Sequence, residues 1–249
     1  MSARAAAILP VRYASTRLPG KPLLDRTGKP LIRHVWEAVS RARTLDPVIV
    51  ATDDERIARV CRDFGARVEL TRAEHPSGSD RVAEVVQRLG LDLALNVQGD
   101  EPELDPGDLD RLAERLADGE EDLVTLAYRL GPDDKEALAD PNVVKVVLDD
   151  RGRALYFSRC PIPHGVPPGE ALGHQGVYGW RREALLRFAA APPAAAERHE
   201  RLEQLRALAL GMTVGVVVTR HRSLGIDTPE DYARFVERSA GAGVRHGTP

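Results

Sequence analysis

Short apolar runs alternate along this chain with segments in which apolar residues recur at helical spacing, and this alternation restricts the fold more than any other feature. The runs are too short for helices and are typical of buried strands. Strands joined by helical crossovers pair in parallel, with helices on both faces. The sequence therefore predicts an α/β fold with a mostly parallel central sheet. The predicted strands are residues 5–10, 48–51, 67–70, 93–97, 123–128 and 214–218.

The pattern changes in the middle of the chain. Residues 143–148 and 154–158 are joined by Asp-Asp-Arg-Gly, which is typical of a hairpin. Residues 160–174 are rich in Pro and Gly and are expected to form a loop. Because neither an internal repeat nor a long linker interrupts the chain, we expect one domain over residues 1–249, with a β-rich insertion at about residues 130–180.

Polar residues mark where helices should begin. Thr52, with Glu55 three residues later, is the expected N-cap of the helix after the second strand. Residues 197–210 carry leucines on one side and predict a single amphipathic helix. The motif GIDTPED predicts the start of the last helix, with Pro229 in its first turn, and the residues after Ala240 are expected to fray.

Charge and composition argue against several classes of function. The 249 residues carry a formal net charge of −3 and a pI of about 6.2, so no global attraction to nucleic acid or to an anionic membrane is expected. No apolar run approaches the length of about 18 residues that a membrane span requires. Cys61 and Cys160 have no CxxC spacing, which argues against a disulfide framework or a zinc site. These features predict a cytoplasmic protein.

The loop RYASTRLPGKPL, residues 12–23, gathers the cations Arg12, Arg17 and Lys21 directly after the first predicted strand. Open α/β sheets bind ligands at this end of their strands. The loop lacks the spacing of a Walker A motif, and the chain contains no GxGxxG. Guanidinium forks, an ammonium and loop N–H groups nevertheless match a triphosphate, and Ser15 is assigned to the same nucleotide site. The alternative is a solvated surface loop.

Two carboxylates are candidates for a metal site beside this loop. Asp100 in NVQGDEP follows a buried predicted strand and should reach the same edge of the sheet. Asp227 in GIDTPED comes from far along the chain. Mg²⁺ prefers a few carboxylates together with phosphate oxygens, so these residues predict a magnesium site. Either residue could instead cap a helix or form a turn.

Further polar groups carry weaker signals. HPSGSDR, residues 75–81, could contact a base or a sugar, or it could be a connecting loop in which Ser79 or Asp80 caps the next helix. Arg159 could neutralise a substrate carboxylate or form a surface ion pair. Other chemistries find little support, because the chain lacks HExxH and GxSxG motifs and neither cysteine has an activating neighbourhood.

At this point the chain resembles a known family, the 3-deoxy-manno-octulosonate cytidylyltransferases (CMP-Kdo synthetases). The similarity spans about residues 5–236, and its motifs occur in the family's order. These motifs are RYASTRLPGKPL, VATDDERIA, HPSGSDRVAEV, NVQGDEP, NVVKVVLDDRGRALYFSR, LEQLRAL and GIDTPED.

The resemblance implies a Rossmann-like nucleotidyltransferase fold and a reaction in which CTP and 3-deoxy-D-manno-octulosonate give a CMP-sugar and pyrophosphate for lipopolysaccharide precursors. It also implies Mg²⁺ dependence, a homodimer and a cytoplasmic location. The catalytic group would be Arg12, Lys21, Asp100 and Asp227, with both aspartates binding the metal. The nucleotide would contact Pro10, Arg12, Arg17, Lys21, Ser77 and Gln98. The sugar acid would face Arg81, Arg159, His174, Tyr178, Glu203 and Gln204.

Three other functions remain open at this stage. The enzyme could activate a different acid sugar, of the sialic type or an amino analogue. It could transfer a nucleotide to a hexose 1-phosphate, which requires a sugar phosphate as the second substrate. The chain could also be a non-catalytic nucleotide-sensing module, although such a module has no need for both Asp100 and Asp227.

Overall fold

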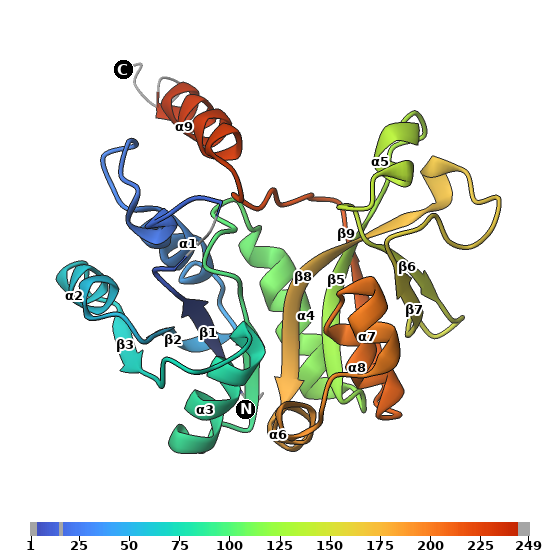
Figure 1. Cartoon of the computed structure of the whole chain (residues 1–249), viewed down its shortest axis with the longest axis horizontal. Helices are drawn as coiled ribbons and strands as arrows, with labels where there is room; N and C mark the ends of the chain where they lie inside the picture. The colour runs from blue at the N-terminus through green and yellow to red at the C-terminus, as the bar shows by residue number, and fades with distance from the viewer. Residues whose placement is uncertain (1–3, 15–16, 244–249) are drawn as a thin grey trace.

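The computed structural model describes residues 4–14 and 17–243, with only the backbone described for residues 241–243, so that Ser15 lies outside the described residues. Its central sheet has the strand order β3–β2–β1–β4–β8–β5–β9 (Figure 1). Parallel pairs join β1 to β2 and β4, β2 to β3, and β5 to β9, whereas β8 runs antiparallel between β4 and β5. The predicted mostly parallel sheet is confirmed. The strands are β1 (Ala5–Val11), β2 (Leu45–Thr52), β3 (Arg67–Leu70), β4 (Leu93–Asn96), β5 (Leu123–Arg129), β8 (Leu172–Arg181) and β9 (Val214–Thr219).

Helices pack on both faces of this sheet, as the sequence predicts. Ala7 and Leu9 of β1 point into one core with α1, α2 and α4, whereas Ile8 points into the other core with α3, α6 and α8. This division follows from the alternation of side chains along a strand. The helices are α1 (Leu31–Val39), α2 (Glu55–Asp63), α3 (Gly78–Leu89), α4 (Pro106–Asp118), α6 (Arg182–Ala190), α7 (Ala195–Glu200), α8 (Gln204–Ala209) and α9 (Pro229–Gly243).

A hairpin projects from one side of the sheet, on the right of Figure 1. Its strands β6 (Lys145–Leu148) and β7 (Ala154–Ser158) are antiparallel, and β6 also pairs with the start of β8. The short helix α5 (Lys135–Ala139) precedes it. Lys145 is fully buried and donates to the carbonyls of Asp140 and Arg159, at 2.9 and 2.6 Å, so it ties the two ends of the hairpin together. The far end of β8 lies within the main sheet.

The structure corrects three predictions about helix ends. Asp54, not Thr52, is the N-cap of α2, because Thr52 is still part of β2 and the Asp54 carboxylate accepts from the amides of Arg56 and Ile57. The predicted single helix over residues 197–210 is broken between α7 and α8 by Arg201, whose φ of 54° closes α7 in the left-handed region. The last helix continues past Ala240 to Gly243, and the rest of the predicted frayed tail lies outside the described residues.

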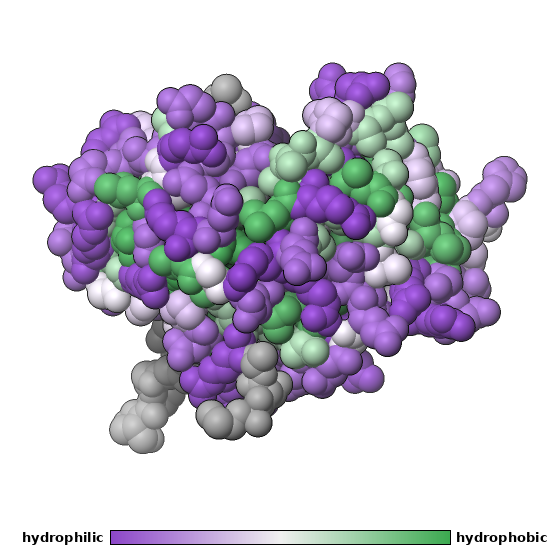
Figure 2. Space-filling view, turned by 90° about the horizontal axis from the view of Figure 1, so that it is seen from below, coloured by the Kyte–Doolittle hydropathy of each residue, from purple (hydrophilic) through white to green (hydrophobic). Residues whose placement is uncertain are grey.

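The outer surface is mostly polar on the side seen from below in Figure 2, where hydrophilic residues surround separate apolar patches. Among the described residues, no helix is long and apolar enough to cross a membrane.

Candidate active site

A cavity of about 450 Å³ opens where β1 and β4 end and α3 begins. In Figure 1, β1 points toward this end of the molecule, where α9 also lies. Open α/β sheets bind ligands at such a strand edge because the loops after the strands meet there. The lining residues are Pro10, Val11, Arg12, Ala14, Arg17, Lys21, Pro22, Gly78, Arg81, Gln98, Gly99, Asp100 and Asp227.

Lys21 lies between the two predicted metal carboxylates. Its ammonium donates to Asp100 Oδ2 at 2.6 Å, to the carbonyl of Ile226 at 2.7 Å and to Asp227 Oδ1 at 3.3 Å. The Lys21 side chain is only 12% exposed, so solvent screens its ammonium less than it screens the half-exposed Asp227. Arg17 adds an ion pair to Asp227 at 3.1 Å. Residues far apart in the sequence therefore form one charged cluster at the cavity.

A glycine turn positions Lys21. Gly20 has a φ of 67°, in the left-handed region that favours glycine, and it caps the 3-10 helix η1 (Lys21–Leu23). A Cβ at Gly20 would lie 3.3 Å from the hydroxyl of Tyr13. The turn therefore directs the Lys21 side chain from the charged loop toward Asp100 and Asp227.

A second wall of the cavity is formed by uncharged residues. Gly78, the first residue of α3, lies against Pro10, and a Cβ at Gly78 would approach Pro10 Cγ to 3.2 Å and Gln98 Oε1 to 4.0 Å. Ser77, and neither Ser79 nor Asp80 as predicted, is the N-cap of α3: its Oγ accepts from the amide of Asp80 at 3.2 Å and donates to Asp80 Oδ2 at 2.6 Å. Pro10, Gly78 and Gln98 thus form a closely packed, uncharged part of the cavity wall.

Arg81 lines the cavity with these residues, although the resemblance assigns it to the sugar acid. Its side chain is 2% exposed and pairs with Asp53 Oδ1 at 2.8 Å and with Thr71 Oγ1. Burial, together with the nearby charge of Arg12, lowers the pKa of Arg81, while Asp53 opposes this shift. Asp53 is thus the counterion that holds a buried guanidinium beside the cavity.

The predicted sugar-facing residues His174, Tyr178 and Gln204 form a separate buried network. The Thr125 hydroxyl donates to the carbonyl of Val177 at 2.8 Å, so its oxygen accepts from His174 Nε2 at 2.9 Å. His174 Nδ1 then accepts from the Gln204 amide at 3.5 Å, and Gln204 Oε1 accepts from the Tyr178 hydroxyl at 3.1 Å. Burial lowers the pKa of His174 to about 3, so the imidazole is neutral, as this network requires.

Glu203, which precedes Gln204 in the sequence, makes its hydrogen bond to α3. Ser79 donates to Glu203 Oε1 at 2.8 Å and accepts from Asn96 Nδ2 at 3.2 Å. Burial raises the pKa of Glu203. Ser79 directly follows Gly78, so Glu203 contacts the first turn of α3 next to the cavity wall.

Arg159 lies at a third place, beside the hairpin. Its Nε donates to the carbonyl of Glu200 at 2.6 Å and its Nη1 to the carbonyl of Pro141 at 2.8 Å. The Glu200 carboxylate accepts from the Arg159 amide at 2.8 Å. Backbone carbonyls thus fix the guanidinium next to the break between α7 and α8.

From the sequence, neither Glu101 nor Asp53 was given a role in the site. Burial, and then the charge of Asp100, raise the pKa of Glu101 to about 8, and its Oε2 is buried without a hydrogen-bond partner. Asp53 directly follows β2, and Glu101 lies in the loop after β4. Their positions after strands were the available signal that they belong to the site. Sequence alone cannot show that one carboxylate faces a buried arginine and the other is enclosed.

The donor set around Lys21 fits Mg²⁺. Asp100 and Asp227 share one cationic partner, so their oxygens already face the same point. Carboxylates are the ligands that Mg²⁺ takes together with phosphate oxygens.

Comparisons with known proteins agree with this geometry. The profile of the family described as cytidylyltransferase matches residues 6–214. A 3-deoxy-manno-octulosonate cytidylyltransferase of Geobacter sulfurreducens is 46% identical, over 93% of this chain and 98% of its own. The enzyme of the same name from Solibacter usitatus is 45% identical, over 91% of each chain.

Solved structures point the same way. CMP:2-keto-3-deoxy-manno-octonic acid synthetase, solved with CTP, has a TM-score of 0.90 at 37% identity, over 96% of this chain and 99% of the other. A cytidylyltransferase of Leptospira borgpetersenii, with a TM-score of 0.62 at 16% identity, covers 94% of this chain and 85% of its own and shares the fold. The chain belongs to the cytidylyltransferase family, among the 3-deoxy-manno-octulosonate cytidylyltransferases.

Proposed function

We propose that this protein transfers the cytidylyl group of CTP to 3-deoxy-D-manno-octulosonate, giving the CMP-sugar and pyrophosphate for lipopolysaccharide precursors. The observation that carries the proposal is the charged cluster at the strand edge, in which Lys21 lies between Asp100 and Asp227 beside Arg17. Cations for a triphosphate and carboxylates for a metal are what nucleotidyl transfer requires. The names of the relatives supply the nucleotide and the sugar acid.

In the reaction, the anomeric hydroxyl of the sugar attacks the α-phosphorus of CTP. A new P–O bond forms to the sugar, the bond from the α-phosphorus to the β-phosphate oxygen breaks, and pyrophosphate leaves with the electron pair of that bond. The hydroxyl proton is released to solvent. Positioning and charge neutralisation supply most of the acceleration of such transfers.

Arg12, Arg17 and Lys21 are proposed to bind the phosphates, because all three cationic side chains line the cavity. They would stabilise the negative charge that builds on the leaving pyrophosphate. When Lys21 turns toward the phosphates, its two carboxylate partners become available to a metal ion.

Mg²⁺ is proposed to bind at Asp100 and Asp227. When bound there, it would neutralise phosphate charge and acidify an attached hydroxyl. The residues themselves contribute the fixed carboxylates on two separate loops.

The base is proposed to lie against Pro10, Gly78 and Gln98, which form an uncharged, closely packed part of the cavity wall. Ser77 shapes this wall by capping α3. We place Arg81 on the nucleotide side too, since it lines the same cavity.

The sugar acid is proposed to meet Arg159 and the network of His174, Tyr178, Glu203 and Gln204. Arg159 would attract the sugar carboxylate, and the neutral imidazole and amide would offer hydrogen bonds to sugar hydroxyls. Because these side chains are buried, the sugar would have to displace some of their mutual hydrogen bonds.

Pyrophosphate release tests the proposed function. The protein with CTP and Mg²⁺ is supplied in turn with 3-deoxy-D-manno-octulosonate, a sialic acid and a hexose 1-phosphate. We expect release only with the octulosonate. Faster release with the sialic acid would favour the rival sugar, and CTP binding without any release would favour a sensing module.

A homodimer and a cytoplasmic location are further proposals. Among the described strands β7 pairs with β6 alone, and its Leu155 and Tyr156 are 59% and 40% exposed. A second copy would cover this open edge. We expect a Leu155→Glu variant to elute as a monomer in size-exclusion chromatography with light scattering, and a wild-type monomer would contradict this. Unpaired Cys61 and Cys160 are consistent with a reducing compartment.

A further inference from the structure

An irregular loop, residues 71–77, joins β3 to α3 and ends at the wall of the cavity. Its last residue, Ser77, precedes Gly78, which lies against Pro10 and close to Gln98. Movement of the loop would therefore change the width of the site for the base. Loops without regular hydrogen bonds depend on side chains to fix them.

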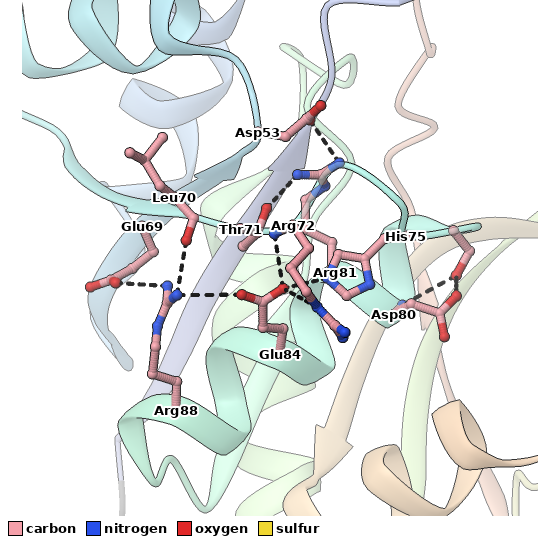
Figure 3. A network of polar contacts seen from close by, with 11 residues as sticks. Asp53, Glu69, Leu70, Thr71, Arg72, His75, Asp80, Arg81, Glu84 and Arg88 are labelled. Atoms are coloured by element: carbon pink, nitrogen blue, oxygen red, sulfur yellow. Dashed lines mark hydrogen bonds and ion pairs between the residues drawn. The ribbon is translucent and has the colours of Figure 1, made fainter.

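Side chains on one side of α3 reach back and hold this loop (Figure 3). Residues three and four apart lie on the same side of a helix. Asp80 binds Ser77 at the end of the loop, and Arg81 binds Thr71 at its start. The middle of the loop is held by Glu84, one turn further along α3.

Glu84 accepts two hydrogen bonds from the loop through a single oxygen, which also lies 3.6 Å from Nε of Arg72. Its Oε2 accepts from the amide of Arg72 at 3.1 Å and from Nε2 of His75 (Figure 3). The His75 side chain is 7% exposed and that of Glu84 19%, so the contact between them is largely shielded from water. Burial acts to raise the pKa of Glu84, but the hydrogen bonds from His75 and Arg72 prevail and lower it. Glu84 is thus a carboxylate that accepts both donors at neutral pH.

The other oxygen of Glu84 faces a different group. Oε1 lies 3.4 Å from Nη1 of Arg88, which also donates to the carbonyl of Leu70 at 2.9 Å. Arg88 Nη2 binds Glu69 at 2.9 Å. These contacts join α3 to β3. They involve neither the amide of Arg72 nor the ring of His75. Arg88 therefore provides a matched control within the same network.

We propose that Glu84 is a positioning residue for the nucleotide: by holding Arg72 and His75, it fixes the loop that places Ser77 and Gly78 against the base. Glu84 does not line the cavity, so it acts through the loop. The inference rests on the proposed function, because it concerns how the same site selects CTP.

Steady-state kinetics of Glu84→Ala test the proposal. We expect the KM for CTP to rise about tenfold, since two hydrogen bonds to the loop are lost, and kcat to stay within about twofold. The KM for the sugar acid should be unchanged. The preference for CTP over UTP, measured as the ratio of kcat/KM values, should fall about fivefold, because a loose wall discriminates less between the two bases.

Two further variants make the test decisive. Arg88→Gln should keep the wild-type KM for CTP and the wild-type preference. His75→Leu removes one of the two hydrogen bonds that Glu84 accepts from the loop. This variant should raise the KM for CTP and lower the preference for CTP, as Glu84→Ala does. It therefore tests the proposal even if Glu84→Ala fails to fold.

Three results would overturn the proposal: an unchanged KM for CTP in the folded Glu84→Ala or His75→Leu variant, an equal rise in both KM values, or the same effect in Arg88→Gln. If the wild type itself releases no pyrophosphate from CTP, the proposed function fails instead.

Discussion

The ammonium of Lys21 lies 2.6 Å from the carboxylate of Asp100, and the same nitrogen lies 3.3 Å from Asp227. A cation of the protein thus joins two carboxylates on separate loops at the edge of the sheet. The same three groups, together with a triphosphate and Mg²⁺, would exchange partners: Lys21 would bind phosphate and the carboxylates would bind metal.

Replacement of Lys21 by Met should lower kcat/KM for CTP by about 100-fold, because a charge-assisted contact to the phosphates is lost. The variant should also respond more strongly to Mg²⁺ in the absence of CTP, since Asp100 and Asp227 lose their shared counterion. Thermal unfolding with and without Mg²⁺ measures this response. An equal rise in Tm for the variant and the wild type would contradict the exchange, and Lys29→Met, which removes only the pair with Glu37, is the control.

Asp100→Asn should reduce kcat about 1,000-fold at saturating CTP and Mg²⁺, because an amide is a poor ligand for a hard cation that neutralises phosphate charge. Circular dichroism should show an intact fold, as Asp100 is partly exposed. Pyrophosphate release gives kcat. A variant with wild-type kcat would show that Asp100 is not a metal ligand in turnover.

The neutral state of His174 predicts a dependence of stability on pH. Its pKa of about 3 in the folded protein is below the ordinary value of 6.5, so between these values the unfolded chain binds a proton that the folded protein excludes. The free energy of unfolding therefore rises with pH across this window, by about 1.4 kcal/mol per unit at most, and this contribution is constant above pH 6.5.

Urea unfolding of the wild type and of His174→Phe at pH 5 and pH 7.5 isolates this contribution. The stability of the wild type relative to the variant should be about 2 kcal/mol smaller at pH 5. The constant loss of the Thr125 and Gln204 contacts cancels in this comparison. The same difference at both pH values would mean that His174 does not titrate as its burial requires.

Arg81 and Arg159 should affect different substrates. Arg81→Lys should raise the KM for CTP about tenfold, because Lys cannot keep both the Asp53 and Thr71 contacts beside the cavity. Arg159→Lys should raise the KM for the sugar acid by a similar factor and leave that for CTP unchanged. Substrate-saturation kinetics separate the two effects, and a reversed pattern would place Arg81 at the sugar.

The sheet and the position of the cavity could be predicted from the sequence, because both depend on local patterns. Apolar runs such as that of β1 define strands, and polar loops after parallel strands must meet at one edge. Arg12, Lys21 and Asp100 could be placed at this edge for that reason alone. Asp227 was also placed there, with its alternative role as a helix cap left open.

What the sequence could not show are contacts that depend on packing. Lys21 and Asp227 are 206 residues apart, and no periodicity indicates that they touch. The break at Arg201 interrupts an otherwise continuous amphipathic pattern, because the chain must turn to place Gln204 beside Tyr178. The burial of His174 and the pairing of Arg81 with Asp53 likewise follow from tertiary structure.

The central claim is that the α-phosphorus of CTP is transferred to the octulosonate at the cavity that Lys21, Asp100 and Asp227 share. Phosphorus NMR of the protein with CTP, Mg²⁺ and 3-deoxy-D-manno-octulosonate tests it most directly. We expect equal amounts of a CMP-sugar phosphodiester and pyrophosphate, growing as CTP disappears. CDP with inorganic phosphate, or unchanged CTP, would contradict it.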